Sequence, residues 1–180
     1  IQSCLLMDEA GECQRVHNII LAEEGSQARV ITGCTTSPSV KEGYHLGVSE
    51  FYVKKGAHLT FTMVHNWADD FHVRPRTGIM VEEDGTFINN YILLKPLRSI
   101  QSYPRAVLQG ARSRARFNTI VYGRHESEID LGSLIELNGR GTRGEAISRS
   151  LGRERAKVMM RGRLKARSND AQAHLECRGM

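Results

Sequence analysis

Long hydrophobic runs are missing from this chain of 180 residues, and so are the cysteine spacings that build zinc knuckles or disulfide frameworks. No apolar run approaches the roughly 18 residues needed to cross a bilayer. The opening residues, IQSCLLMDEAGEC, lack the basic and apolar regions of a secretory signal. The four cysteines, at positions 4, 13, 34 and 177, include no C-x-x-C pair. We therefore expect a cytoplasmic protein with free thiols and no membrane segment.

Aromatic residues are also scarce, at 6% of the chain with a single tryptophan. The charge is uneven: residues 1–104 hold 9 Lys and Arg against 12 Asp and Glu, whereas residues 105–180 hold 16 against 8. A basic half can attract nucleic acid, but proteins that bind single strands usually add stacking aromatics. Arginines at the alternating positions 112, 114 and 116 are more typical of the solvated face of a strand. Nucleic acid is therefore not an expected partner.

A phrase that returns along the chain is the main pattern in this sequence: an apolar strand, a short polar turn, and a second strand. The phrases are NIILAEEGSQARVIT, EFYVKKGAHLTFTM, GIMVEEDGTFINNYI, AVLQGARSRARFNTIV, SLIELNGRGTRGEAIS and the looser GRLKARSNDAQAHLEC. Their turns lie near Gly25, Gly56, Gly85, Gly110, Gly139 and Asn169, 25 to 31 residues apart. A constant period of this length predicts a repeat architecture.

The repeats predict strands and not helices. β-branched residues crowd the runs, alternation is close to period 2, and no apolar stripe of period 3.6 extends over ten residues. A propeller blade needs four strands and about 40 residues or more, which is longer than this period. The fold class is therefore predicted to be all-β, a solenoid or β-helix of about six coils with a period of roughly 29 residues.

Residues at equal distance from each turn should form a column along the stacked coils. Cys34 lies nine residues after Gly25, and His65 nine after Gly56, which predicts neighbours on adjacent coils with backbones about 5 Å apart. The column continues through Leu94, Thr119 and Ser148 and reaches Cys177 within one residue. A thiol beside an imidazole can be held partly as thiolate, which accepts sulfur and binds soft metals. The alternative is a small buried hydrophobe beside a satisfied polar residue.

Two further patterns suggest chemistry but have simpler explanations. HNWADDFH at 65–72 places His65, His72 and two aspartates around Trp67, yet the consecutive Asp69 and Asp70 would point to opposite faces of a strand, so no metal site is expected. GRGTRG at 139–144 satisfies G-x-G-x-x-G, but the EAISRSLG that follows is too short and serine-broken for a dinucleotide-binding helix. We expect a glycine-rich turn there.

Several segments together resemble the SufB/SufD family, the scaffold components of the SUF iron–sulfur cluster assembly machinery. The segments are VITGCTTSP, KKGAHLTFTMVHNW, QSYPRAVLQG, EIDLGS, AISRSLG, MMRGRL and SNDAQAHLECRGM. They follow the family's order over nearly all 180 residues. The resemblance implies a right-handed parallel β-helix, in agreement with the solenoid predicted from the period.

The resemblance implies a non-enzymatic scaffold that accepts sulfur from a cysteine desulfurase and assembles an iron–sulfur cluster with the ATPase SufC. The cluster would be transient, with none expected on this chain, and a SufB/SufD-type partner or a self-dimer is implied. Cys34 matches the cysteine associated with sulfur acceptance, and Asn66 and Trp67 match an Asn-Trp pair inside the helix. We hypothesise that Cys34 takes the persulfide, that His65 helps to hold it ionised, and that Trp67 shields it. Cys177 also matches a cysteine of relatives and is expected to be structural more than functional.

Family members continue beyond the position of Met180, with coils linked to cluster assembly and dimerisation and a helical segment that docks SufC. The chain therefore resembles one partial core domain, residues 1–180, that lacks the C-terminal part of the family fold. Cys34 and the Asn66-Trp67 pair favour a SufB protein or a merged archaeal-type SufBD protein. Two other classes remain open: a secreted-type β-helix enzyme acting on acidic polysaccharide, and a structural or nucleic-acid-binding solenoid.

Overall fold

The computed structural model describes residues 1–93 and 95–180, and its regular elements in these ranges are all β-strands. The strands are β1 (Gln2–Met7), β2 (Cys13–Ala22), β3 (Gln27–Thr36), β4 (Glu42–Val53), β5 (His58–Asn66), β6 (Asp70–Val73), β7 (Arg76–Val81), β8 (Thr86–Leu93), β9 (Ser99–Ser102), β10 (Arg105–Leu108), β11 (Arg114–Gly123), β12 (Glu128–Leu137), β13 (Arg143–Gly152), β14 (Lys157–Ala166) and β15 (Gln172–Gly179). Within these ranges no helix is long and apolar enough to span a membrane.

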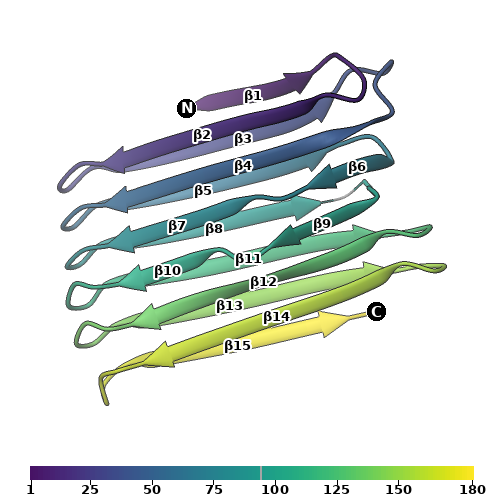
Figure 1. The fold of residues 1–180 in the computed structure, drawn as a ribbon. Helices are drawn as coiled ribbons and strands as arrows, with labels where there is room; N and C mark the ends of the chain where they lie inside the picture. Colours follow the sequence, from purple (N-terminus) through teal and green to yellow (C-terminus); the bar gives the residue numbers. More distant parts are fainter. Residues whose placement is uncertain (94) are drawn as a thin grey trace.

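The strands form two facing sheets, and each coil of the chain contributes to both (Figure 1). One sheet has the order β1-β3-β5-β8-β11-β13-β15. The other stacks β2 and β4, then the interrupted pairs β6/β7 and β9/β10, then β12 and β14. Every pairing is parallel, and partners such as Arg114 and Arg143 lie one coil apart in sequence. The predicted all-β parallel solenoid of about six coils is confirmed, while its right-handedness and its status as one partial domain stay predictions.

The turns show that glycine was an unreliable guide to the register. One equivalent turn position has a positive φ in Gly25, Gly56, Asp84, Arg112 and Gly141. Gly85 therefore lies one residue after this position, and Gly110 two residues before it. Gly110 has a different reason to be glycine: a Cβ there would lie 1.9 Å from the backbone nitrogen of Glu83 in the turn of the preceding coil. Glycine marks left-handed backbone in some turns and close stacking in others.

The turn position at Asp84 and Arg112, in place of Gly85 and Gly110, corrects the predicted column. Cys34 lies opposite His65, as predicted, but the next partners of His65 are Leu93 and then Val121. Leu94 lies outside the described residues. Thr119, Ser148 and Cys177 do form one column, which continues in the other direction to Tyr91 and Met63. Cys34 and Cys177 therefore do not share a column, and that part of the prediction is wrong.

The interior contains two apolar clusters along the strands. The first includes the phenylalanines Phe51, Phe61, Phe87 and Phe117, and the second includes Trp67, Phe71, Leu93 and Ile100. Along the strands, buried polar residues separate the two apolar clusters, and Thr32, Ser49 and Asn89 are examples. A polar stretch inside an otherwise apolar solenoid needs internal partners, so this region is where chemistry is expected.

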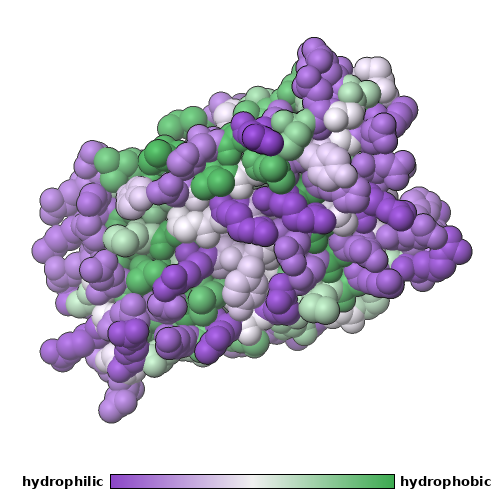
Figure 2. All heavy atoms as spheres, in the orientation of Figure 1, coloured by the Kyte–Doolittle hydropathy of each residue, from purple (hydrophilic) through white to green (hydrophobic). Residues whose placement is uncertain are grey.

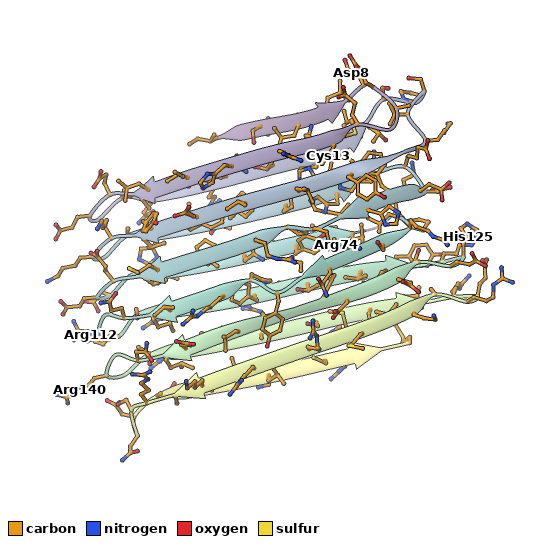
Figure 3. All side chains as sticks on the ribbon, viewed as in Figure 1. Asp8, Cys13, Arg74, Arg112, His125 and Arg140 are labelled. Carbon is orange, nitrogen blue, oxygen red and sulfur yellow. The ribbon has the colours of Figure 1, made fainter. Side chains whose placement is uncertain are left out.

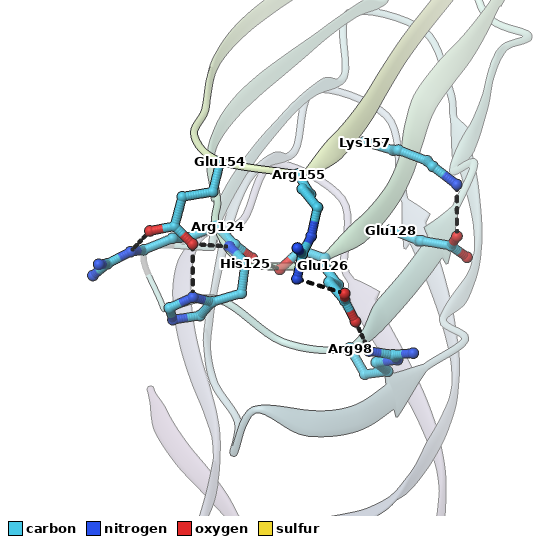
Figure 4. Close-up of polar contacts among 9 residues, drawn as sticks. Arg98, Arg124, His125, Glu126, Glu128, Glu154, Arg155 and Lys157 are labelled. Carbon is cyan, nitrogen blue, oxygen red and sulfur yellow. Dashed lines mark hydrogen bonds and ion pairs between the residues drawn. The ribbon is translucent and has the colours of Figure 1, made fainter.

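Hydrophilic residues gather at both rows of turns, with hydrophobic residues between them on the face that Figure 2 shows, and the side chains at the turns are drawn in Figure 3. At one row of turns Arg112 pairs with Glu83 and Asp84 of the preceding coil. At the opposite row, Glu126 pairs with both Arg98 and Arg155 (Figure 4). Arg114 and Arg116 lie on the exposed face of β11, as predicted, whereas Arg112 belongs to the turn. Most of these pairs are well exposed, so each contributes little stability alone.

Candidate functional site

Cys34 is the buried cysteine of the chain and lies deep in the stack. It occupies β3 between Leu5 of β1 and His65 of β5, with 1% of its surface exposed. Its sulfur lies 3.7 Å from the sulfur of Met63. His65 is 2% exposed, so the predicted neighbours are both interior residues. All four cysteines are free, and the other three are exposed.

A third residue, His45, joins this pair from the opposite sheet. The ligating atoms of Cys34, His45 and His65 all lie within 4.8 Å of one another. The two imidazole rings have centroids 6.0 Å apart and meet nearly edge to face. His45 is not among the residues predicted from the sequence, although its position in β4 indicates an inward-facing side chain. Counting back by twos from the buried Phe51 places His45 on the inward face of that strand.

Both imidazoles are held by polar partners on one nitrogen. His45 Nδ1 lies 2.8 Å from Gln14 Oε1, and His65 Nδ1 lies 2.7 Å from the hydroxyl of Tyr91. Because the amide oxygen of Gln14 only accepts hydrogen bonds, His45 donates from Nδ1 and keeps the lone pair on Nε2. Each ring is thus fixed in orientation while its other nitrogen remains available.

Trp67 and Asn66, which match the Asn-Trp pair of the family, lie in different environments. Trp67 is fully buried, stacks on Phe71 at 4.8 Å, and packs against His45 at 4.9 Å between ring centroids. Its indole nitrogen has no hydrogen-bond partner within the described residues. Asn66 is exposed and donates from Nδ2 to the hydroxyl of Thr35 on the neighbouring coil. Trp67 is therefore part of the site, whereas Asn66 holds two outer strand ends together.

Burial favours the neutral form of all three site residues. It raises the pKa of Cys34 to about 12, with a smaller contribution from Cys4. Burial also lowers the pKa of His45 to about 4 and that of His65 to about 3. The pKa of the Tyr91 hydroxyl is raised, again chiefly by burial. In this state Cys34 is a thiol and His65 a neutral imidazole, so an ionised sulfur would need another positive charge.

An internal cavity of about 50 Å³ adjoins the three residues. Its lining includes Cys34, His45, His65, Met63 and Tyr91, and it extends past polar side chains such as Ser49, Asn89 and Thr119. A space of this size, with several polar side chains in its lining, can hold water or another small polar group. The site therefore combines a cysteine thiol, two imidazoles and space for a small molecule or ion.

The remaining candidate residues lie away from this interior site. Asp69 and Asp70 are exposed, and His72 contacts Ser99 and stacks on Tyr44, so the HNWADDFH segment divides between interior and surface. Cys177 is exposed on β15 and lies opposite Ser148. The 139–144 segment includes the turn between β12 and β13 and the first two residues of β13, in agreement with the predicted glycine-rich turn.

Comparison with known proteins connects this fold and site to one family. The family described as SUF system FeS cluster assembly, SufBD core domain, matches residues 5–180. The chain belongs to the SufBD core domain family. A SufBD family protein of Methanothermobacter thermautotrophicus strain Delta H is 48% identical over the whole chain. One of Archaeoglobus fulgidus is 45% identical, also over the whole chain. A third, from Pyrococcus horikoshii, is 30% identical over 96% of the chain.

The SufBD relatives are much longer than this chain. It covers 44% of the Methanothermobacter protein, 48% of the Archaeoglobus protein and 38% of the Pyrococcus protein. Each of these relatives is described as an iron–sulfur cluster assembly protein of the SufBD family. The predicted family is confirmed. The activity and partners of a whole SufBD protein remain proposals for this chain.

Proposed function

We propose that this SufBD core chain is a non-enzymatic scaffold of iron–sulfur cluster assembly, and that Cys34 accepts the incoming sulfur. The observation that carries the proposal is the placement of the buried thiol of Cys34 on a cavity of about 50 Å³ within a SufBD core domain. A bound sulfur atom needs space beside the thiol and protection from water, and the cavity supports both.

The transfer would form one sulfur–sulfur bond and break another. The Cys34 sulfur attacks the terminal sulfur of a donor persulfide, the donor leaves as a thiol, and Cys34 carries the new persulfide. The thiol proton passes to the departing donor sulfur, so no external oxidant is required. Because burial raises the pKa of Cys34 to about 12, the sulfur must lose its proton as the donor arrives.

The proposed partners follow from the family. A cysteine desulfurase system would supply sulfur, the ATPase SufC would drive the assembly cycle, and a SufB/SufD-type protein or a second copy of this chain would complete the scaffold. The iron–sulfur cluster is the cargo of this process, and the cytoplasm is its proposed location. His65 and Trp67 would enclose the loaded sulfur, since both pack around the same interior site.

Transfer of labelled sulfur tests this proposal. The purified chain would be incubated with a cysteine desulfurase and cysteine carrying radioactive sulfur, then separated under non-reducing conditions. Label that is released by thiol reductant should appear on the unsubstituted chain and on Cys177→Ser, and should disappear in Cys34→Ser. Equal label on Cys34→Ser would contradict sulfur acceptance at Cys34.

A further inference from the structure

The interior cluster of Cys34, His45 and His65 has the composition of a metal site. A thiolate and two imidazoles are ligands that suit zinc, ferrous iron and related divalent ions. The three residues come from β3, β4 and β5 and are all buried. In the described part of the chain, this is the one group of three or more histidines, cysteines or carboxylates close enough to share an ion.

The spacing of the ligand atoms fits one ion after a small adjustment. Metal–sulfur and metal–nitrogen bonds of about 2.3 and 2.0 Å around a tetrahedral ion place the ligand atoms about 3.5 Å apart. The three ligand atoms here lie within 4.8 Å of one another. Side-chain movements of about 1 Å would therefore bring them to coordinating distance, without a change in the strand register.

The residues around the imidazoles also support metal binding. Gln14 accepts from His45 Nδ1, which leaves Nε2 as the ligand nitrogen. Gly47 leaves space there, since a Cβ at that position would lie 2.9 Å from His45 Nε2. The Tyr91 hydroxyl can accept from His65 Nδ1, at 2.7 Å, and so present the other nitrogen of that ring. Outer partners of this kind orient the histidines of protein metal sites.

A metal ion also supplies the positive charge that the cluster lacks. No lysine or arginine is among the described residues that line the cavity, and neutral imidazole is the form that binds metal. On binding, the Cys34 sulfur forms a bond to the ion and its proton passes to the solvent buffer. The cavity beside the three residues leaves space for a fourth ligand, such as water or sulfide.

We propose that Cys34, His45 and His65 bind one divalent transition-metal ion, with zinc and ferrous iron the best matched, and that its fourth position opens onto the internal cavity. This site does not depend on sulfur acceptance by Cys34. Sulfur labelling without metal binding would reject the metal site alone, and metal binding without labelling would reject the sulfur acceptor alone.

Cobalt titration of the reduced, chelator-treated chain tests the site directly. One equivalent of Co²⁺ should produce sulfur-to-cobalt charge-transfer absorption and quench the fluorescence of Trp67, the single tryptophan, whose ring lies 4.9 Å from that of His45. Zn²⁺ should displace the cobalt and remove both signals. Cys34→Ser should abolish the absorption, and His45→Gln and His65→Gln should each weaken binding.

Two further variants separate the site from general effects on folding. Gln14→Ala keeps all three ligands but removes the partner of His45, and should weaken cobalt binding by about tenfold. Cys177→Ser should bind cobalt like the unsubstituted chain. The proposal is overturned if the folded unsubstituted chain binds no cobalt, or if the absorption persists in Cys34→Ser.

Discussion

His45 and His65 belong to strands of different sheets, yet their rings lie 6.0 Å apart and nearly perpendicular inside the solenoid. Each ring also packs against Trp67. Cross-strand pairing places Cys34 beside His65, while packing between the sheets brings His45 to the same point. The site is therefore produced by the solenoid's two layers together, and neither sheet alone contains it.

Cys34 should react with iodoacetamide more slowly at pH 8 than Cys4, Cys13 and Cys177. Burial both blocks access and raises the pKa of Cys34 to about 12, whereas the other three thiols are exposed. Mass spectrometry of peptides after timed labelling measures each site in one sample. His65→Ala should speed Cys34 labelling by opening the interior. Slower labelling in that variant would instead support a thiolate held by His65.

The free energy of unfolding should fall as the pH drops below about 6.5, the pKa of an unfolded imidazole. The folded state lowers the pKa of His45 to about 4 and of His65 to about 3, so only the unfolded state takes up protons in this window. This stability is complete above pH 6.5 and is lost toward pH 4 and 3. Each imidazole should cost about 1.4 kcal/mol per pH unit between these limits.

Urea unfolding at pH 7.5, 6 and 5 measures this dependence. His65→Gln should flatten it relative to His58→Gln, a matched change at an exposed ring. The pKa of His72 is lowered too, chiefly by burial and then by Arg74, so the difference between variants is the useful quantity. Identical slopes in His65→Gln and His58→Gln would show that His65 is not buried in the neutral form.

The repeat period was sufficient to predict the fold, because backbone pairing requires each coil to have nearly the same length. The register of the coils was harder to predict from the sequence. Gly25 and Gly56 mark the left-handed turn position correctly, but Asp84 and Arg112 occupy it in later coils. A short aspartate tolerates such backbone, and Arg112 is held there by acidic neighbours. Counting from glycines therefore shifted the column after His65.

The candidate site was predicted only in the part that depends on neighbouring strands of one sheet. Cys34 and His65 have the same offset from two turns, so their pairing could be counted. His45 approaches from the facing sheet, and no sequence count gives the alignment of two sheets across a core. Tyr91 and Gln14, which orient the imidazoles, come instead from strands paired with those of His65 and His45 in the same sheets, and Gln14 lies directly opposite His45. The period predicts the coils, but packing determines which inward side chains meet.

Gly110→Ala should destabilise the chain by about 2 kcal/mol or more. A methyl group there would lie 1.9 Å from the Glu83 backbone nitrogen, which cannot move without opening the stacked turns. Gly33→Ala is the matched control, because a Cβ on Gly33 meets no atom within 4 Å. That variant should stay within about 0.5 kcal/mol of the unsubstituted chain. Thermal unfolding of both variants measures the difference, and equal stabilities would contradict the close stacking of turns.

Arg112→Gly should be more stable than Arg112→Ala by about 1 kcal/mol, the reverse of the usual order. Both changes remove the ion pairs to Glu83 and Asp84, so the remaining difference is the backbone. Arg112 has a φ of 56°, which glycine adopts freely and alanine does not. At Arg116, inside β11, glycine should instead be less stable than alanine, because an extended strand has no such preference. Urea unfolding of the four variants measures both differences. The same order at both positions would mean that the turn does not hold Arg112 in left-handed backbone, and that the turn positions do not align as the structure indicates.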